Sequence, residues 1–348
     1  MKKICLLFGG MSEEYDVSCV SASYVAEELD PKKYEVIKVG ITKEGEWKLF
    51  SGSTEEMRQH TWQNGACVPC VLSPDRKDHG LLIRDGEGVR LEKIDVLFPV
   101  LHGAYGEDGC IQGLFRMSGI PFVGCGVAAS ALGLDKALSK MVFDGVQIPQ
   151  AQWLLIEDIE KADREAEADR CQRELGFPCF VKPASTGSSI GITKAHDREE
   201  LLEAFDTAQR IDRKIVVEKA IVGRELECAV LGNDKPEVSC VGEVLSAGEF
   251  YDYESKYFDQ ASQTVIPAAL TQEESDQIRS YALTAYQALG CRGLSRCDFF
   301  LGEDGTVYIN EINTLPGFTQ ISMFSKLWMA QGKSYSQVLD DLIAFAAC

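Results

Sequence analysis

The chain has 348 residues, of which 45% are hydrophobic and 26% are charged. This length allows two or three packed units, and the composition is that of an ordinary soluble globular protein. The net charge of −19 argues against a nucleic-acid partner and an anionic membrane surface, because both attract basic proteins, whereas ATP needs only a few local cations.

The first part of the chain predicts a Rossmann-like opening with a strand, a glycine turn and a helix. The apolar run in residues 1–10 is too short for a signal peptide, and no stretch approaches the length of a transmembrane helix. The expected elements are strands over 3–8, 34–40 and 47–51, and a helix that ends near Leu29.

The glycine turn differs from the GxGxxG motif of dinucleotide-binding proteins and carries three acids, Glu13, Glu14 and Asp16. Such a loop repels a pyrophosphate, so a cation such as a substrate ammonium fits it better. A plain, solvated capping loop is the alternative.

The 13 cysteines lie mostly inside apolar runs, which favours a reducing cytoplasm. Cys67 and Cys70 form a lone CxxC pair. No second Cys or His pair lies at zinc spacing, so we favour structural thiols over a metal or redox role.

A second glycine-rich loop follows a buried strand predicted over 94–101. It reads His102-Gly-Ala-Tyr-Gly-Glu-Asp-Gly109, and loops at the carboxyl ends of parallel strands commonly hold ligands. His102 alone among the four histidines lies at a strand end beside glycines. We therefore expect His102 to be functional and the other histidines to be surface residues.

The character of the sequence changes after residue 135. Residues 156–174 are dense in charge and predict a helix with a solvated face. A loop rich in Gly and Ser, residues 184–192, then follows the strand that contains Lys182. Its N–H groups and hydroxyls are typical of phosphate loops, but it is not a Walker A sequence and is a weak signal alone.

The last third of the chain predicts further strands and two helices. Strands are expected over 214–221, 223–230 and 238–245. The aromatic, charged loop 250–257 favours a mobile lid. Thr271 and Glu274 form a capping box that begins a helix ended by Gly290, and a final helix is expected over 336–347.

Two strand-like runs, 294–301 and 307–312, flank Asp304-Gly305, which is a strong hairpin signal. If the loop is symmetric about this dipeptide, Asp298 faces Glu311 and Arg296 faces Asn313. Because side chains alternate along a strand, all four then share one face of the ribbon. A loop of three or five residues would break this register.

The expected pairing favours a metal and phosphate site. Facing carboxylates repel each other unless a cation lies between them. Oxygen ligands of this kind suit Mg²⁺ shared with nucleotide phosphates, and Arg296 adds a fixed charge for phosphate or an oxyanion. The Gly317 N–H can also approach a ligand closely. An acidic, solvated hairpin is the alternative.

Seven segments, in this order along nearly the whole chain, resemble the D-alanine–D-alanine ligase family: FGGMSEEYDVS, LHGAYGEDG, VKPASTGSSIGI, VVEKAIVGRE, FYDYESKY, GLSRCDFF and INEINTLPGFT. The resemblance implies a mixed α/β and α+β fold, with a Rossmann-like domain over 1–134 and an ATP-grasp fold divided into 135–222 and 223–348. It implies a cytoplasmic, homodimeric enzyme that uses ATP and Mg²⁺ (two ions, with Mn²⁺ as a possible substitute) to join two D-alanines through an acyl phosphate, for peptidoglycan precursors.

The resemblance also implies residue roles. Nucleotide contacts fall to Lys136, Lys182, Ser188, Glu218, Lys219, Ile221, Glu225, Phe250 and Lys256. Metal ligands are Asp298, Glu311 and Asn313. Substrate contacts fall to Glu14, His102, Arg296, Ser322 and Met323. The catalytic set is Glu14, Ser188, Tyr257, Arg296 and Gly317, with Ser188 and Tyr257 joining Glu14 in a link that closes the lid.

The second substrate stays open between D-alanine and D-serine. Lys256 and Tyr257 resemble the members that use an amine, so D-lactate is not expected. Gln320, Ile321 and Met323 depart from the common family pattern, and an apolar Met323 favours D-alanine. The alternatives are another ATP-grasp carboxylate–amine ligase and a non-catalytic nucleotide-binding protein, although the latter predicts missing charges at the reacting centre.

Overall fold

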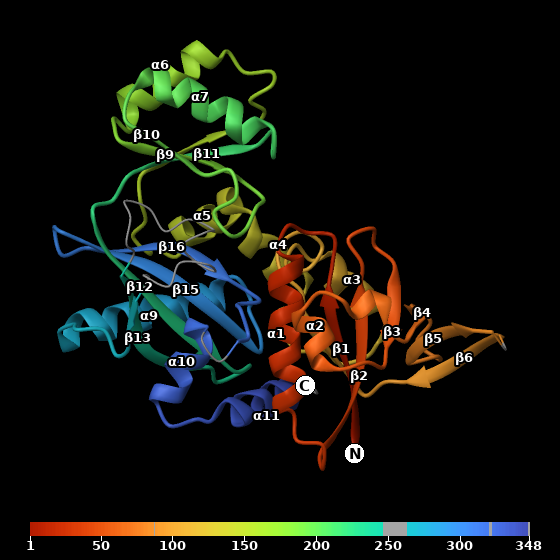
Figure 1. Cartoon of the computed structure of the whole chain (residues 1–348). Coiled ribbons are helices and arrows are strands. Elements are labelled where there is room, and N and C mark those ends of the chain that lie inside the picture. The colour runs from red at the N-terminus through yellow and green to blue at the C-terminus, as the bar shows by residue number, and fades with distance from the viewer. Residues whose placement is uncertain (87, 246–262, 320–321, 347–348) are drawn as a thin grey trace.

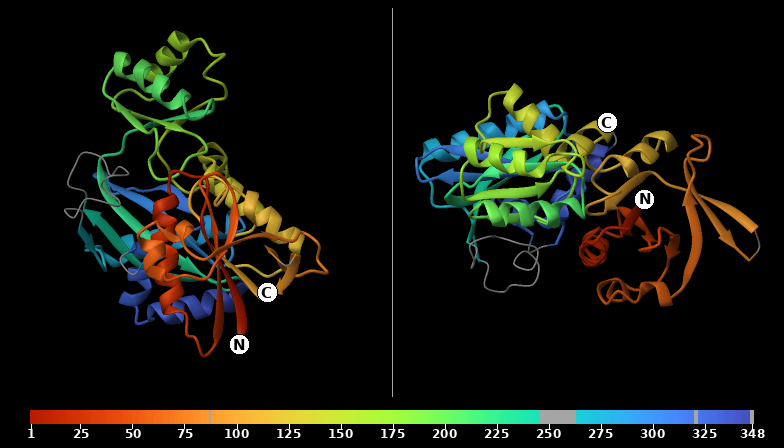
Figure 2. Two further views of the ribbon diagram at one scale, coloured as in Figure 1. Left: turned by 45° about the vertical axis from the view of Figure 1, so that its right-hand side comes forward. Right: turned by 90° about the horizontal axis from the view of Figure 1, so that it is seen from above.

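The computed structural model describes residues 1–86, 88–245, 263–319 and 322–346, and within them three β-sheets carry helices on their faces (Figure 1). The second sheet lies above the third, and the first lies beside them, as the turned views of Figure 2 show. No described helix is both long and apolar enough to cross a bilayer.

The first sheet has the strand order β6-β5-β4-β3-β2-β1-β7. Its strands are β1 (Lys2–Gly9), β2 (Tyr34–Ile41), β3 (Trp47–Phe50), β4 (Cys67–Leu72), β5 (Gly80–Asp85), β6 (Gly88–Lys93) and β7 (Val96–Val100). β1 pairs in parallel with β2 and β7, and the other pairs are antiparallel. The strands predicted over 3–8, 34–40, 47–51 and 94–101 are confirmed.

Both faces of β1 are buried, which explains its continuous apolar run. Leu6 and its neighbours two residues away pack in the cluster that includes α1 (Tyr15–Glu28), whereas Leu7 packs in the cluster that includes α3 (Cys110–Ser118). Cys67 and Cys70 lie on β4, three residues apart, and therefore on opposite faces. Cys70 belongs to the second cluster and Cys67 packs against the first, as structural thiols do.

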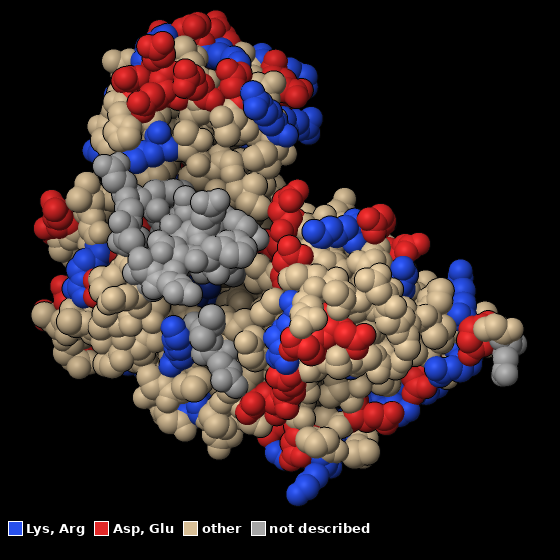
Figure 3. All heavy atoms as spheres, in the orientation of Figure 1, with Lys and Arg blue, Asp and Glu red and all other residues tan. Residues whose placement is uncertain are grey.

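The second sheet is antiparallel with the order β10-β9-β11-β8. It contains β8 (Trp153–Ile156), β9 (Cys179–Pro183), β10 (Thr193–Ala195) and β11 (Ile215–Lys219), with α6 (Arg164–Glu174) and α7 (Arg198–Gln209) against one face. The helix predicted over 156–174 is wrong in its first part. Ile156 ends β8, and the Asp163 carboxylate caps α6 by accepting from the Ala166 N–H. Charged side chains cover the outer face of this layer, at the top of Figure 3.

The third sheet is antiparallel with the order β14-β13-β12-β15-β16. It contains β12 (Gly223–Leu231), β13 (Glu237–Leu245), β14 (Gln263–Val265), β15 (Leu294–Gly302) and β16 (Val307–Asn313). Helix α9 (Gln272–Ala288) covers one face. The predicted capping box is confirmed, because Thr271 Oγ accepts from the Glu274 N–H while the Glu274 carboxylate accepts from the Thr271 N–H.

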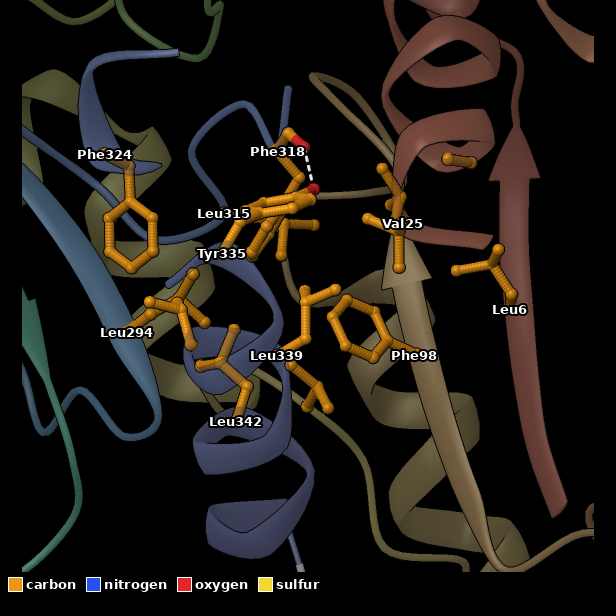
Figure 4. Close-up of a cluster of buried hydrophobic side chains, with 14 of the residues drawn as sticks. Leu6, Val25, Phe98, Leu294, Leu315, Phe318, Phe324, Tyr335, Leu339 and Leu342 are labelled. Atoms are coloured by element: carbon orange, nitrogen blue, oxygen red, sulfur yellow. Dashed lines mark hydrogen bonds between the residues drawn. The ribbon is translucent and has the colours of Figure 1, made fainter. Parts of the chain in front are cut away.

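The remaining described helices are α2 (Thr54–Arg58), the 3₁₀ turn η1 (Trp62–Asn64), α4 (Val127–Leu134), α5 (Lys136–Gly145), α10 (Met323–Ala330) and α11 (Tyr335–Ala346). The final helix is thus confirmed, one residue earlier than expected. It packs in a buried cluster that joins the first and third sheets: Phe98 of β7 and Leu294 of β15 lie on either side of Leu339 and Leu342 (Figure 4). The Tyr335 hydroxyl in this cluster donates to the Phe318 carbonyl.

The domain division at residues 134/135 and 222/223 stays a proposal. Its support is that each sheet lies within one of the three spans.

Candidate active site

Two adjoining cavities lie among the three sheets. The larger, of about 570 Å³, lies between the second and third sheets, and the smaller, of about 70 Å³, lies between the third sheet and the loops that contain Glu14, His102 and Ser188. Lys136 and Glu311 line both cavities, so ligands in the two could meet there.

The hairpin of β15 and β16 has the predicted register but a different turn. Asp298 pairs with Glu311 and Arg296 with Asn313, as expected. The turn is wrong, because Gly302 donates to Thr306 at 3.0 Å and leaves three loop residues, 303–305, rather than two. Near this turn the register is shifted by one residue.

A β-bulge restores the register before the site is reached. Phe299 pairs with Ile309 whereas Asp298 pairs with Glu311, so Asn310 is the extra residue. A bulge re-aims the side chain of its extra residue. Here Asn310 Oδ1 accepts from Lys182 Nζ at 3.2 Å, which links the hairpin to the second sheet.

Arg296 lies between carboxylates of two strands. Its Nε and Nη2 donate to the two Asp298 oxygens, each at 2.7 Å, and its Nε lies 2.9 Å from Glu227 Oε2. Burial would lower the pKa of the guanidinium, but the charges of Asp298 and Glu227 outweigh it and hold that pKa well above its usual value. The fork is therefore fixed and always charged.

Glu227 was not predicted from the sequence. It pairs with Asp298 across β12 and β15, and Asp298 pairs with Glu311, so three carboxylates lie in one row across neighbouring strands. The alternation of side chains along β12 is the signal that could have found Glu227, because it shares a face with Glu225.

The expected metal ligands supply a donor set that fits a hard divalent cation. Asp298 and Glu311 face each other, and Asn313 follows on the same face, with its Oδ1 held by the Leu315 N–H at 3.0 Å. Among the described residues no group of three or more acids, His or Cys is arranged as a metal cage. An ion here would therefore need phosphate oxygens or water as further ligands, as Mg²⁺ commonly does.

Lys182 and Glu218 project from β9 and β11 into the larger cavity. Lys182 Nζ donates to Glu218 Oε2 at 3.0 Å, and the Lys140 ammonium of α5 lies 3.2 Å from Glu218 Oε1. Burial would raise the pKa of Glu218, but the charges of Lys140 and Lys182 lower it to about 2. Lys140 was not predicted.

The Gly/Ser-rich loop reaches from the second sheet to the N-terminal loop. Lys136 Nζ donates to the Thr186 carbonyl, and the Ser188 hydroxyl donates to Glu14 Oε1. Gly187 lets the loop come this close, because a Cβ there would lie 3.3 Å from Glu14 Oε2. The structure therefore brings Glu14, Ser188 and Lys136 together on the wall of the smaller cavity.

His102 lies at the end of β7 and lines the smaller cavity, as its place in the sequence suggested. Its Nδ1 is 3.4 Å from Glu107 Oε1, and its buried Nε2 has no hydrogen-bond partner among the described residues. Burial opposes the charged imidazole, but Glu107 and Glu14 outweigh it and raise the pKa of His102. Burial raises the pKa of Glu107, a residue that the sequence had not singled out.

The remaining expected residues are placed as follows. Lys219, Ile221 and Glu225 line the larger cavity, and Gly317 lines the smaller one. Ser322 Oγ accepts from the Thr319 N–H at 3.1 Å and lies beside Gly317. The structure places Met323 in a buried apolar cluster against Gly242, rather than on the described walls of either cavity.

Five expected positions lie outside the described residues: Phe250, Lys256 and Tyr257 of the proposed lid, and Gln320 and Ile321 beside Ser322.

Comparison with known proteins gives matches over nearly the whole chain. Residues 3–125 match a family model described as D-ala D-ala ligase N-terminus, and residues 142–344 match one described as D-ala D-ala ligase C-terminus. The D-alanine–D-alanine ligase of Acetivibrio thermocellus is 46% identical, over 99% of this chain and 96% of that protein. The ligase of the same name from Ruminiclostridium cellulolyticum is 47% identical, over 99% of this chain and 95% of that protein.

Solved structures give the same result. The VanG D-Ala:D-Ser ligase from Enterococcus faecalis superposes with a TM-score of 0.90, at 39% identity and over 99% of both chains. The D-alanine-D-alanine ligase from Coxiella burnetii superposes with a TM-score of 0.85, at 32% identity and over 99% of this chain and 95% of that one. These matches confirm the predicted fold class.

Proposed function

The chain belongs to the D-alanine–D-alanine ligase family and is thus an ATP-dependent ligase. We propose that it joins two D-alanines for peptidoglycan synthesis where the two cavities adjoin. The proposed location of the reaction rests on one observation, which is that cationic side chains and carboxylates converge at the junction of the two cavities. Arg296, Lys136 and Glu311 all line the smaller cavity, and the last two also line the larger one.

We propose that ATP occupies the larger cavity and the first D-alanine the smaller one. Lys136 and Lys182 would bind the phosphates, with the backbone N–H groups around Ser188. Glu218 to Ile221 would border the adenine and Glu225 would hold the ribose. Phe250 and Lys256 of the proposed lid would complete the nucleotide site.

The first step converts a poor electrophile into a good one. Glu14 receives the ammonium of the first D-alanine and His102 lies beside that substrate, so the substrate carboxylate points toward the larger cavity. A carboxylate oxygen attacks the γ-phosphorus, the bond to the β-phosphate oxygen breaks, and ADP and an acyl phosphate form. Water must be excluded at this stage, because it would hydrolyse the acyl phosphate. We assign that role to the link of Glu14, Ser188 and Tyr257.

In the second step the amine of the second D-alanine attacks the acyl carbon. The tetrahedral intermediate carries an oxyanion, which the Arg296 guanidinium and the Gly317 N–H would stabilise. The intermediate then collapses, phosphate leaves with the C–O bonding pair, and the proton lost by the amine passes to the departing phosphate. Ser322 would contact the carboxylate of the second substrate.

We propose that Asp298, Glu311 and Asn313 hold Mg²⁺, as two ions or with Mn²⁺ as a substitute. When bound, the metal neutralises charge on the phosphates and stabilises the transferring group. Both Asp298 oxygens contact Arg296 in this structure, so metal binding would weaken that pairing while Glu227 keeps Arg296 in place.

The likeness to the VanG ligase favours one second candidate, D-serine as the second substrate. We favour D-alanine, because the curated relatives are named D-alanine–D-alanine ligases. Phosphate release should require D-alanine and fail with L-alanine. Mass spectrometry of the product from an equimolar mixture of D-alanine and D-serine then decides the second substrate.

Three outcomes of that assay are informative. D-alanyl-D-serine as the main product would overturn our choice of second substrate. Equal phosphate release with L-alanine would indicate another carboxylate–amine ligase. No phosphate release at all would favour a non-catalytic nucleotide-binding protein. We also propose a homodimer in the cytoplasm, and the family resemblance supports both.

A further inference from the structure

Lys140 is a buried cation that the proposed reaction does not use. It lies on α5, one helical turn after Lys136, and its side chain is only 1% exposed. It is absent from the described residues that line either cavity. Its ammonium lies 3.2 Å from Glu218 Oε1 and forms an ion pair with it. Lys140 is therefore not placed to touch a nucleotide.

Burying this ammonium is costly. A lysine charge taken out of water is unfavourable unless a partner compensates it, and burial accordingly lowers the pKa of Lys140 despite the charge of Glu218. A methionine has a similar unbranched shape without that cost. The feature that needs explanation is thus the charge of Lys140, rather than its apolar stem.

The charges around Glu218 explain it. Glu218 Oε1 faces Lys140 and Oε2 accepts from Lys182 at 3.0 Å, so two ammonium groups share one carboxylate. The three groups together carry one net positive charge, and only Lys182 and Glu218 line the cavity. Without Lys140, the charges of Glu218 and Lys182 would cancel each other, and this pair would add no net positive charge to that of Lys136, which also lines the cavity.

We propose that Lys140 is a positioning residue that neutralises Glu218 from behind, so that Lys182 keeps its positive charge for the nucleotide phosphates. This rests on the proposed function, in which Lys182 contacts phosphate. Asn310 is a neutral acceptor on the other side of Lys182, at 3.2 Å, and holds the ammonium without cancelling its charge. Lys140 thus preserves the effect of the Lys182 charge, whereas Asn310 helps to fix the position of the Lys182 ammonium.

The test compares the full-length enzyme with Lys140→Met by calorimetry with ADP and with adenosine, and by steady-state kinetics. We expect the Kd for ADP and the KM for ATP to rise on the order of tenfold, as for one charge lost in a partly screened cavity. The Kd for adenosine and the KM for D-alanine should change less than about twofold, because neither depends on phosphate charge. Lys140→Arg should restore ADP binding.

A double-mutant cycle separates charge from packing. In a Glu218→Gln background there is no carboxylate to neutralise, so adding Lys140→Met should leave the Kd for ADP nearly unchanged. An equal loss in both backgrounds, or equal losses for ADP and adenosine, would overturn the proposal. Lys161→Met, which removes an exposed lysine paired with Asp158, is the matched control.

Lys182→Met distinguishes failure of this inference from failure of the proposed function. If Lys182→Met leaves ADP binding intact, the phosphate role of Lys182 is wrong. If Lys182→Met weakens ADP binding but Lys140→Met does not, only the role of Lys140 is wrong.

Discussion

Replacing Arg296 with alanine tests the reacting centre most directly. Arg296 has two roles in the structure. Its guanidinium lines the smaller cavity, and it balances the negative charges of Asp298 and Glu227. The first concerns the transition state and the second concerns the stability of the fold, so the two must be measured separately.

The expected loss of rate follows from the oxyanion. Removing one preorganised donor costs about 3 kcal/mol of transition-state stabilisation, or roughly 100- to 1000-fold in kcat. Breaking a buried ion pair by removing one partner costs about 3–5 kcal/mol in the free energy of unfolding. Mg²⁺ at Asp298 would replace part of the missing charge, so the loss of stability should be smaller with Mg²⁺ present.

The assay is phosphate release at saturating ATP and D-alanine, with thermal unfolding measured with and without Mg²⁺. Arg296→Lys is the matched control, because it keeps the charge but loses the two-pronged geometry. A folded Arg296→Ala enzyme with kcat within about fivefold of the wild type would refute the oxyanion role, since a lost donor costs far more.

Three other predictions concern the metal, a buried carboxylate and a helix cap. Asp298→Asn should raise the Mg²⁺ concentration for half-maximal activity by about tenfold, because a ligand charge is lost; an unchanged Mg²⁺ titration would move the metal elsewhere. The lowered pKa of Glu218 gives stability that is present above the ordinary pKa of 4.5 and is lost as the pH falls toward about 2. The free energy of unfolding of Glu218→Gln, measured by chemical denaturation, should therefore depend less on pH in that window than that of the wild type, and an equal pH dependence of the two proteins would contradict the ion pairs. Thr271→Ala should cost about 1 kcal/mol of stability with kcat unchanged, and a loss of activity without unfolding would contradict a purely structural cap.

The parts of the site that the sequence predicted are those governed by local periodicity. Alternation along two strands gave the facing pairs of the hairpin, and glycine-rich strand ends gave the loops of His102 and Ser188. The turn was predicted wrongly, because Gly305 adopts a left-handed φ of 77° in a three-residue loop, and a later bulge corrects the register. Nothing in the local sequence signals that bulge.

The residues that were missed depend on contacts between distant elements. Lys140 is one helical turn from Lys136, but its role depends on the ion pair with Glu218 of β11. Only the tertiary fold brings these two residues together. Glu227 is significant because β12 lies beside β15. The antiparallel strands β4 to β6 were also missed, and the alternating apolar residues of β6, Val89 and Leu91, are exposed rather than packed in a core.

Helix α11 has a consequence for how the polypeptide is made. Phe98 of the first sheet packs beside Leu339 and Leu342 from the last residues of the chain (Figure 4). During synthesis, this apolar surface of the first sheet stays exposed to solvent until the ribosome has translated nearly the entire sequence. The N-terminal third is therefore poorly suited to being produced as a separate fragment. A chimera that joins it to the rest of a relative would fold only if the relative's C-terminal helix had side chains that pack against this surface.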